Sequence, residues 1–127
     1  MAYRYSKHYT RDEARALLPE VRNWLADLVR LRGELERFDK RMQSLSRPGS
    51  ATGGRLVNDW VRCLADTKVL LIEFYRREIQ IKDLDRGLLD FPAIICGREV
   101  FLCWERDEDD IEFWHDLDAG YAGRERL

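Results

Sequence analysis

The first third of the chain carries a regular heptad of apolar residues. From Ala14 onward the a and d positions are apolar over about five heptads, which is typical of a helix that packs along a seam. Thr10 and Glu13 form the T-x-x-E pattern of a capping box, so the helix is predicted to begin at Arg11. The seam residues are Ala14, Leu17, Val21, Trp24, Leu28, Leu31, Leu35, Phe38, Met42 and Leu45.

A breaker separates this helix from a second apolar stretch. Residues 46–54 read SRPGSATGG, a run of glycine, proline and serine that is typical of a loop. We assign residues 1–47 to the first helical segment and residues 55–84 to the second helix, with Gly87 placed to end it. Two long helices on either side of one loop predict an antiparallel hairpin that forms a coiled-coil-like arm.

The remaining residues predict a sheet. Residues 88–95, 98–106 and 111–117 read as strands, and Cys96-Gly97 suits a two-residue hairpin turn. Residues 88–118 should therefore form a three-stranded meander, followed by a tail at 119–127. The predicted fold class is α+β: one domain, residues 1–127, in which the helical hairpin packs on a small three-stranded antiparallel sheet.

The two faces of this sheet depend on how the strands pair, because side chains alternate along a strand. We place Ile95 opposite Arg98, and Arg106 opposite Ile111. One face is then apolar and should cover the helices; it includes Leu89, Phe91, Val100, Leu102, Trp104, Phe113 and His115. The other is mixed and includes Asp90, Glu99, Cys103, Ile94, Phe101 and Trp114, of which the last three suggest a dimer contact.

Composition narrows the class of protein. The chain has 127 residues, of which 36% are charged, and a net charge of -2, which argues for one domain and against a globally basic nucleic-acid binder. Basic residues flank the 46–54 breaker, but interleaved acids argue against nucleic-acid binding there as well. No apolar run is long enough to span a membrane, and the N-terminus lacks the apolar core of a signal peptide. Three cysteines at no zinc-like spacing favour reduced thiols in a cytoplasmic protein.

His115 is the main candidate for chemistry. As a ligand or general base, it would use a pocket at the helix–sheet junction with Lys82, Asp83, Trp104 and Arg124 as candidate ligand-binding residues. The alternative is a neutral core histidine that hydrogen-bonds a backbone or carboxylate group.

Asp90, Glu99 and His115 have the right ligand types for a metal. The assumed pairing points His115 away from both carboxylates, so no metal site is predicted. A different turn register would reverse that conclusion. No nucleophile elbow or phosphate loop is present, and no cofactor is predicted.

Two stretches carry a family resemblance: HYTRDEARALLPE near the start, and most of residues 82–124, including GLLDFP, GREV, LCW and WH followed by GYAGR. They resemble the bacterial domain of unknown function 2203 family. The resemblance implies an architecture but no activity. The polar positions that it maps onto are Lys82, Asp83, Asp90, Glu99, His115 and Arg124.

Two functions remain open at this point. The first is a non-enzymatic interaction domain that forms a homodimer, supported by the heptad arm and the aromatic residues of the mixed face. The alternative is a protein that binds a small molecule or a metal, with or without catalysis, around His115. The sequence does not decide whether the protein is an enzyme.

Overall fold

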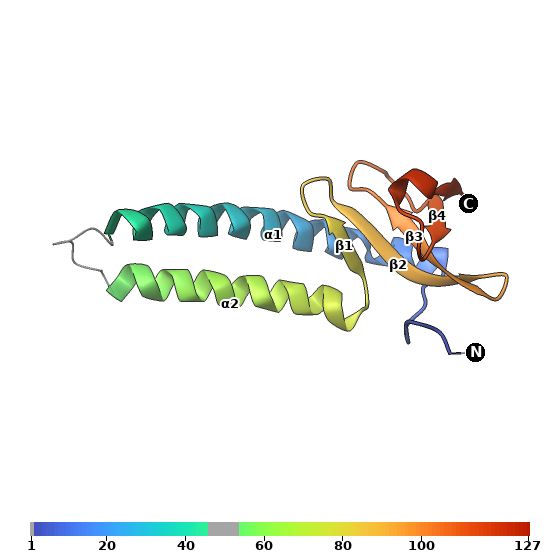
Figure 1. Cartoon of the computed structure of the whole chain (residues 1–127), viewed down its shortest axis with the longest axis horizontal. Helices are drawn as coiled ribbons and strands as arrows, with labels where there is room; N and C mark the ends of the chain where they lie inside the picture. Colours follow the sequence, from blue (N-terminus) through green and yellow to red (C-terminus); the bar gives the residue numbers. More distant parts are fainter. Residues whose placement is uncertain (1, 46–53) are drawn as a thin grey trace.

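Two long helices extend from one end of an antiparallel sheet (Figure 1). The computed structural model describes residues 2–45 and 54–127. The fold class is α+β, as predicted. Its elements are α1 Arg11–Leu45, α2 Gly54–Arg76, β1 Gln80–Asp83, β2 Leu88–Ile95, β3 Arg98–Trp104, β4 Phe113–Asp116, the 3-10 helix η1 Tyr121–Gly123, and β5 Glu125–Arg126. No helix in the described part of the chain is long and apolar enough to cross a membrane.

Helix α1 begins at Arg11, where the capping box predicts it. The backbone N–H of Thr10 donates to Glu13 Oε1 at 3.0 Å, and the backbone N–H of Glu13 donates to Thr10 Oγ1 at 3.1 Å. These reciprocal bonds satisfy two N–H groups that have no partner within the helix.

Helices α1 and α2 lie side by side and run in opposite directions (Figure 1). Their contact buries Leu28 and Leu31 of α1 together with Leu56 and Cys63 of α2. Cys63 Sγ donates to the carbonyl of Leu31 at 3.7 Å. The predicted loop falls mostly on residues 46–53, which lie outside the described residues, so the two-helix hairpin and its coiled-coil-like arm stay predictions.

The prediction that the second helix runs to residue 84 is wrong. Helix α2 ends at Arg76 in a Schellman motif: Ile79 N–H donates to the Phe74 carbonyl, and Glu78 N–H donates to the Tyr75 carbonyl. Glu78 takes the left-handed conformation, with φ of 57°, that glycine normally occupies. Its carboxylate accepts hydrogen bonds from the backbone N–H groups of Ser6 and Lys7, which offset the strain.

The sheet has five strands, so the prediction of three is wrong. Their order follows the sequence, β1-β2-β3-β4-β5. The residues of β1 had been assigned to the second helix, and β5 has two residues, too few for a periodic pattern. Gly87 lies in the β1–β2 turn rather than at a helix end, with φ of 65° and its N–H donating to the Leu84 carbonyl.

The β2–β3 pairing follows the prediction, but the β3–β4 pairing does not. Ile95 lies opposite Arg98, and both Cys96 and Gly97 have positive φ in the turn between them. Beyond β3, however, Phe101 lies opposite His115 and Leu102 opposite Trp114. This is a slip of one residue from the predicted register, and it moves every β4 side chain to the other face.

One face of the sheet packs against α1 and forms the core. Leu18, Val21 and Leu25 of α1 join Leu89, Phe91, Val100, Leu102 and Trp104 in one cluster, and Trp114 packs against it. Trp114 therefore does not lie on the mixed face as predicted.

The chain itself covers much of the mixed face. Phe101 is buried, and its ring centroid lies 5.4 Å from that of Tyr5. Of the three residues proposed for a dimer contact there, only Ile94 is exposed. The mixed face therefore loses the observation that supported a dimer contact.

Candidate functional site

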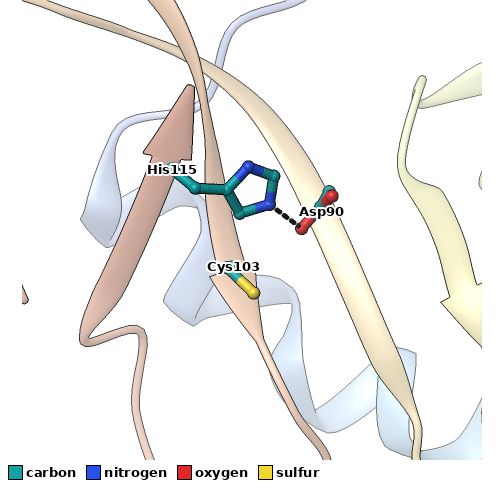
Figure 2. Close-up of side chains that lie close together, drawn as sticks. All are labelled: Asp90, Cys103 and His115. Carbon is teal, nitrogen blue, oxygen red and sulfur yellow. Dashed lines mark hydrogen bonds and ion pairs between the residues drawn. The ribbon is translucent and has the colours of Figure 1, made fainter. Parts of the chain in front are cut away.

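Three adjacent strands bring Asp90, Cys103 and His115 together on the mixed face (Figure 2). Asp90 comes from β2, Cys103 lies opposite it on β3, and His115 follows from β4. All three side chains are buried. Their ligand atoms lie within 4.8 Å of one another.

The hydrogen bonds of His115 restrict where its protons can lie. Nδ1 lies 2.7 Å from the backbone carbonyl of Asp116, so Nδ1 must donate, because a carbonyl only accepts. Nε2 lies 3.0 Å from Asp90 Oδ1. One proton must lie between these two atoms, either on the imidazole or on the carboxyl. The pair therefore holds a proton in a buried place.

Burial raises the pKa of the Asp90 carboxyl, while His115, Lys82 and the Cys103 thiol act in the opposite direction. Burial, together with the negative charge of Asp90, raises the pKa of Cys103 to about 12, against the opposing effect of Arg124. In the chain alone, Cys103 is thus a thiol at neutral pH.

A cavity of about 240 Å³ opens onto this cluster. Asp90, Cys103 and His115 form part of its wall. Lys82 and Leu88 complete the wall on the side of β1 and β2, and the segment after β4 closes the other side with residues 117–121. The cavity joins apolar wall to a few convergent polar groups, which is typical of a small-ligand site.

Arg124 lies next to Cys103, and its guanidinium also contacts Glu108 and Phe113. It forms a bidentate ion pair with Glu108, at 3.3 and 2.6 Å, and its guanidinium lies 3.8 Å from the centroid of the Phe113 ring. Its Nη1 lies 3.9 Å from Cys103 Sγ. Because Glu108 neutralises it, Arg124 is a neighbour of the site rather than a free anion-binding group.

The structure brings some of the candidate residues together and separates others. His115 and Lys82 line the cavity. Asp83 is not in the cavity wall; it accepts a hydrogen bond from the backbone N–H of Arg86. Trp104 lies in the core on the opposite face, where its Nε1 donates to the Glu108 carbonyl. The prediction that His115 lies on the same face as Trp104 and Leu102 is wrong, because the β3–β4 register is shifted by one residue.

Glu99, the third member of the metal trio considered from the sequence, holds the N-terminal segment instead. Its carboxylate accepts from the backbone N–H groups of Arg4 and Tyr5 and lies 2.7 Å from His8 Nε2. Cys103, rather than Glu99, is the third potential metal ligand next to Asp90 and His115. The alternation of β3 had already put Cys103 on the face of Asp90, so the correct β4 register would have revealed the cluster.

Comparisons with known proteins give a family and no activity. The model of the family described as "Uncharacterized conserved protein (DUF2203)" matches residues 7–127. No curated protein and no solved structure matches the chain. The match spans nearly the whole sequence, and the chain belongs to this DUF2203 family.

Proposed function

We propose that the chain binds a small polar ligand in the cavity beside Asp90 and His115. The observation that carries the proposal is a fully buried carboxyl–imidazole pair that lines a cavity. Buried ionisable pairs of this kind concentrate at functional sites, because burial alone gives a fold no reason to keep them.

The wall of the cavity restricts the ligand. A volume of about 240 Å³ is below the usual range for drug-sized molecules, so the ligand is small. Lys82 supplies a cation and Asp90 an oxygen acceptor, while Leu88 and Leu117 supply apolar wall. A small molecule that carries both an anionic and a hydrogen-bonding group fits this wall.

Amide chemical shifts in an NMR fragment screen test the proposal. Small carboxylic acids and amides should shift the amides of Cys103, His115 and Gly120. The matched control is the apolar groove of about 280 Å³ beside Ile95 and Trp114, which the same fragments should leave unshifted. Lys82→Gln should weaken binding of the acids about tenfold. Shifts confined to the control groove, or none at all, would contradict the proposal.

A second candidate function, homodimeric interaction, is favoured by an apolar stripe on α2. Val61, Leu64, Leu71, Ile72 and Tyr75 are all exposed on this helix, and Tyr75 is 83% exposed. Spacings of three (Val61–Leu64, Ile72–Tyr75), four (Leu71–Tyr75) and seven residues (Leu64–Leu71) put them on one side of the helix. In an antiparallel two-fold contact, Leu64 would meet Leu71 of the second copy, and the small Val61 would meet the large Tyr75. The stripe is thus complementary to itself.

Light scattering at micromolar concentration tests this second candidate. Leu71→Ser with Tyr75→Ser should convert a dimer to a monomer of about 15 kDa, the mass of one chain. Val69→Ser is the matched control, because Val69 is exposed on α2 but lies to one side of the stripe. A wild-type chain that stays monomeric at every concentration would remove the dimer.

A cytoplasmic location stays a prediction.

A further inference from the structure

We infer that Asp90, Cys103 and His115 bind one divalent transition-metal ion of the zinc type. The inference rests on the proposed function, because it uses the same site and names the group that would anchor a ligand there. Thiolate, imidazole and carboxylate are the three side-chain groups that bind zinc in proteins, and the cluster offers one of each.

The three donors are already close to the arrangement that such an ion requires. Their atoms lie within 4.8 Å of one another, and His115 Nε2 lies 3.0 Å from Asp90 Oδ1. Metal–ligand bonds of roughly 2.0–2.3 Å in a tetrahedron separate the donors by about 3.3–3.6 Å. The donor atoms therefore have to shift relative to one another by up to about 1.5 Å to reach these separations.

The second hydrogen bond of His115 orients the ring for a metal. Nδ1 donates to the backbone carbonyl of Asp116, which leaves Nε2 as the nitrogen that faces Asp90. Metal-binding histidines usually hold their other nitrogen in this way, because the bond fixes the tautomer and the direction of the lone pair. The carbonyl belongs to the strand that carries His115, so this orientation is built into β4.

The charge of the donor set matches the ion. A carboxylate and a thiolate carry two negative charges, and a neutral imidazole adds none. Binding would displace two protons, the one between Asp90 and His115 and the one on Cys103, so charge stays balanced as the ion enters. Arg124, whose Nη1 lies 3.9 Å from the sulfur, is paired with Glu108, which limits its repulsion of a metal.

The fourth coordination position would face the cavity, because all three donors line its wall. Three protein ligands and one open position are typical of catalytic zinc sites, whereas structural sites use four protein ligands. A small polar ligand in the cavity could occupy the open position. The metal, held by the buried cluster, would then be the group that anchors the small ligand proposed above.

Cobalt and zinc titrations of the full chain, stripped of metal by a chelator, test the inference. Co²⁺ should bind at one ion per chain and give a thiolate charge-transfer band in the near ultraviolet, and Zn²⁺ should displace it. Cys103→Ser should abolish the band and weaken Zn²⁺ binding at least tenfold. Cys63→Ser and Cys96→Ser are the matched controls, since these cysteines lie in α2 and in the β2–β3 turn, and both should behave as the wild type. His115→Gln should weaken binding similarly, with its fold checked by circular dichroism.

Two results would overturn the inference. The first is a folded wild-type chain that binds neither ion at micromolar concentration. The second is binding that persists unchanged in Cys103→Ser, which remains informative even if His115→Gln does not fold. The fragment screen separates the two proposals: fragments that shift Cys103 and His115 in a chain that binds no metal would leave the small-ligand function standing and remove the metal alone.

Discussion

Replacing the two members of the Asp90–His115 pair should have unequal costs. In Asp90→Asn the new amide nitrogen can donate to Nε2 while Nδ1 still donates to the Asp116 carbonyl, so the imidazole keeps both partners and no charge is buried. We expect a loss of about 1 kcal/mol or less. In His115→Phe the carboxyl of Asp90, which is 2% exposed, loses its main partner. Breaking a buried pair in this way costs about 3–5 kcal/mol.

The larger cost should depend on pH. Burial raises the pKa of Asp90, and His115 is the largest of the effects that oppose this rise, so its removal raises the pKa further. A carboxyl whose folded pKa exceeds its unfolded value binds more protons in the folded state, and stability therefore falls as pH rises between the two values. The cost of His115→Phe should be small near the unfolded aspartate pKa, about 4, and reach its full value above the folded pKa.

Urea unfolding, followed by circular dichroism in the presence of a chelator, measures both effects. At about pH 8 the two variants should differ by roughly 2–4 kcal/mol, and at about pH 4.5 the difference should shrink by at least about 1 kcal/mol. Asp118→Asn is the control, because its carboxylate is exposed and should change stability by about 0.5 kcal/mol or less. Equal costs for Asp90→Asn and His115→Phe at both pH values would refute the shared proton.

Three further predictions follow from other parts of the chain. Leu31→Asp places a charge in the buried contact between the helices and should cost about 3–5 kcal/mol, whereas Ala26→Asp on the exposed side of α1 should cost little; a Tm within a degree or two of the parent would show that the contact is not buried. Gly87→Ala should cost clearly more than Gly97→Ala in urea unfolding, because both residues have positive φ but only at Gly87 would the new Cβ lie 2.5 Å from Arg106 Cβ; equal costs would contradict the close approach. Hydrogen bonds from the backbone of Lys7 and from Ser6 lower the pKa of Glu78, so the stabilising effect of its carboxylate is present above the unfolded glutamate pKa and is lost as pH falls through the folded value. Amide exchange at Ser6 and Lys7 should therefore become faster at low pH, and it should be faster at neutral pH in Glu78→Gln. Exchange protection that is unchanged in both cases would argue that Glu78 does not anchor these residues.

Local signals predicted the elements whose ends are fixed by neighbouring residues. The capping box of Thr10 and Glu13 gives the start of α1, and Cys96-Gly97 gives the β2–β3 turn, because each involves residues close in sequence. The end of α2 could not be found in this way. A glutamate occupies the place of the usual glycine, and its stabilising partners, Ser6 and Lys7, lie some seventy residues earlier in the chain.

The cluster of Asp90, Cys103 and His115 was missed for a different reason. Phe113 and Leu117 made the face of β4 that carries His115 look like core, whereas Phe113 is instead half-buried under the guanidinium of Arg124. The chain between β3 and β4 is also longer than the acidic run suggests, since Glu105 and Glu108 bond one another across a turn and Ile111 enters the core. One residue of register then decided whether His115 faced Leu102 or Asp90.

The cost of burying Asp90 and His115 is itself an argument about function. Their place on the sheet could be filled by two apolar side chains of similar volume, and such replacements of buried ion pairs are often neutral or stabilising by about 1–4 kcal/mol. The core on the other face, built from residues such as Phe91 and Trp104, already binds α1 to the sheet without them. The pair also faces a cavity, whereas side chains selected only for packing would have filled that space. A requirement for stability therefore does not account for the cluster, whereas the proposed binding of a metal or a small ligand there would.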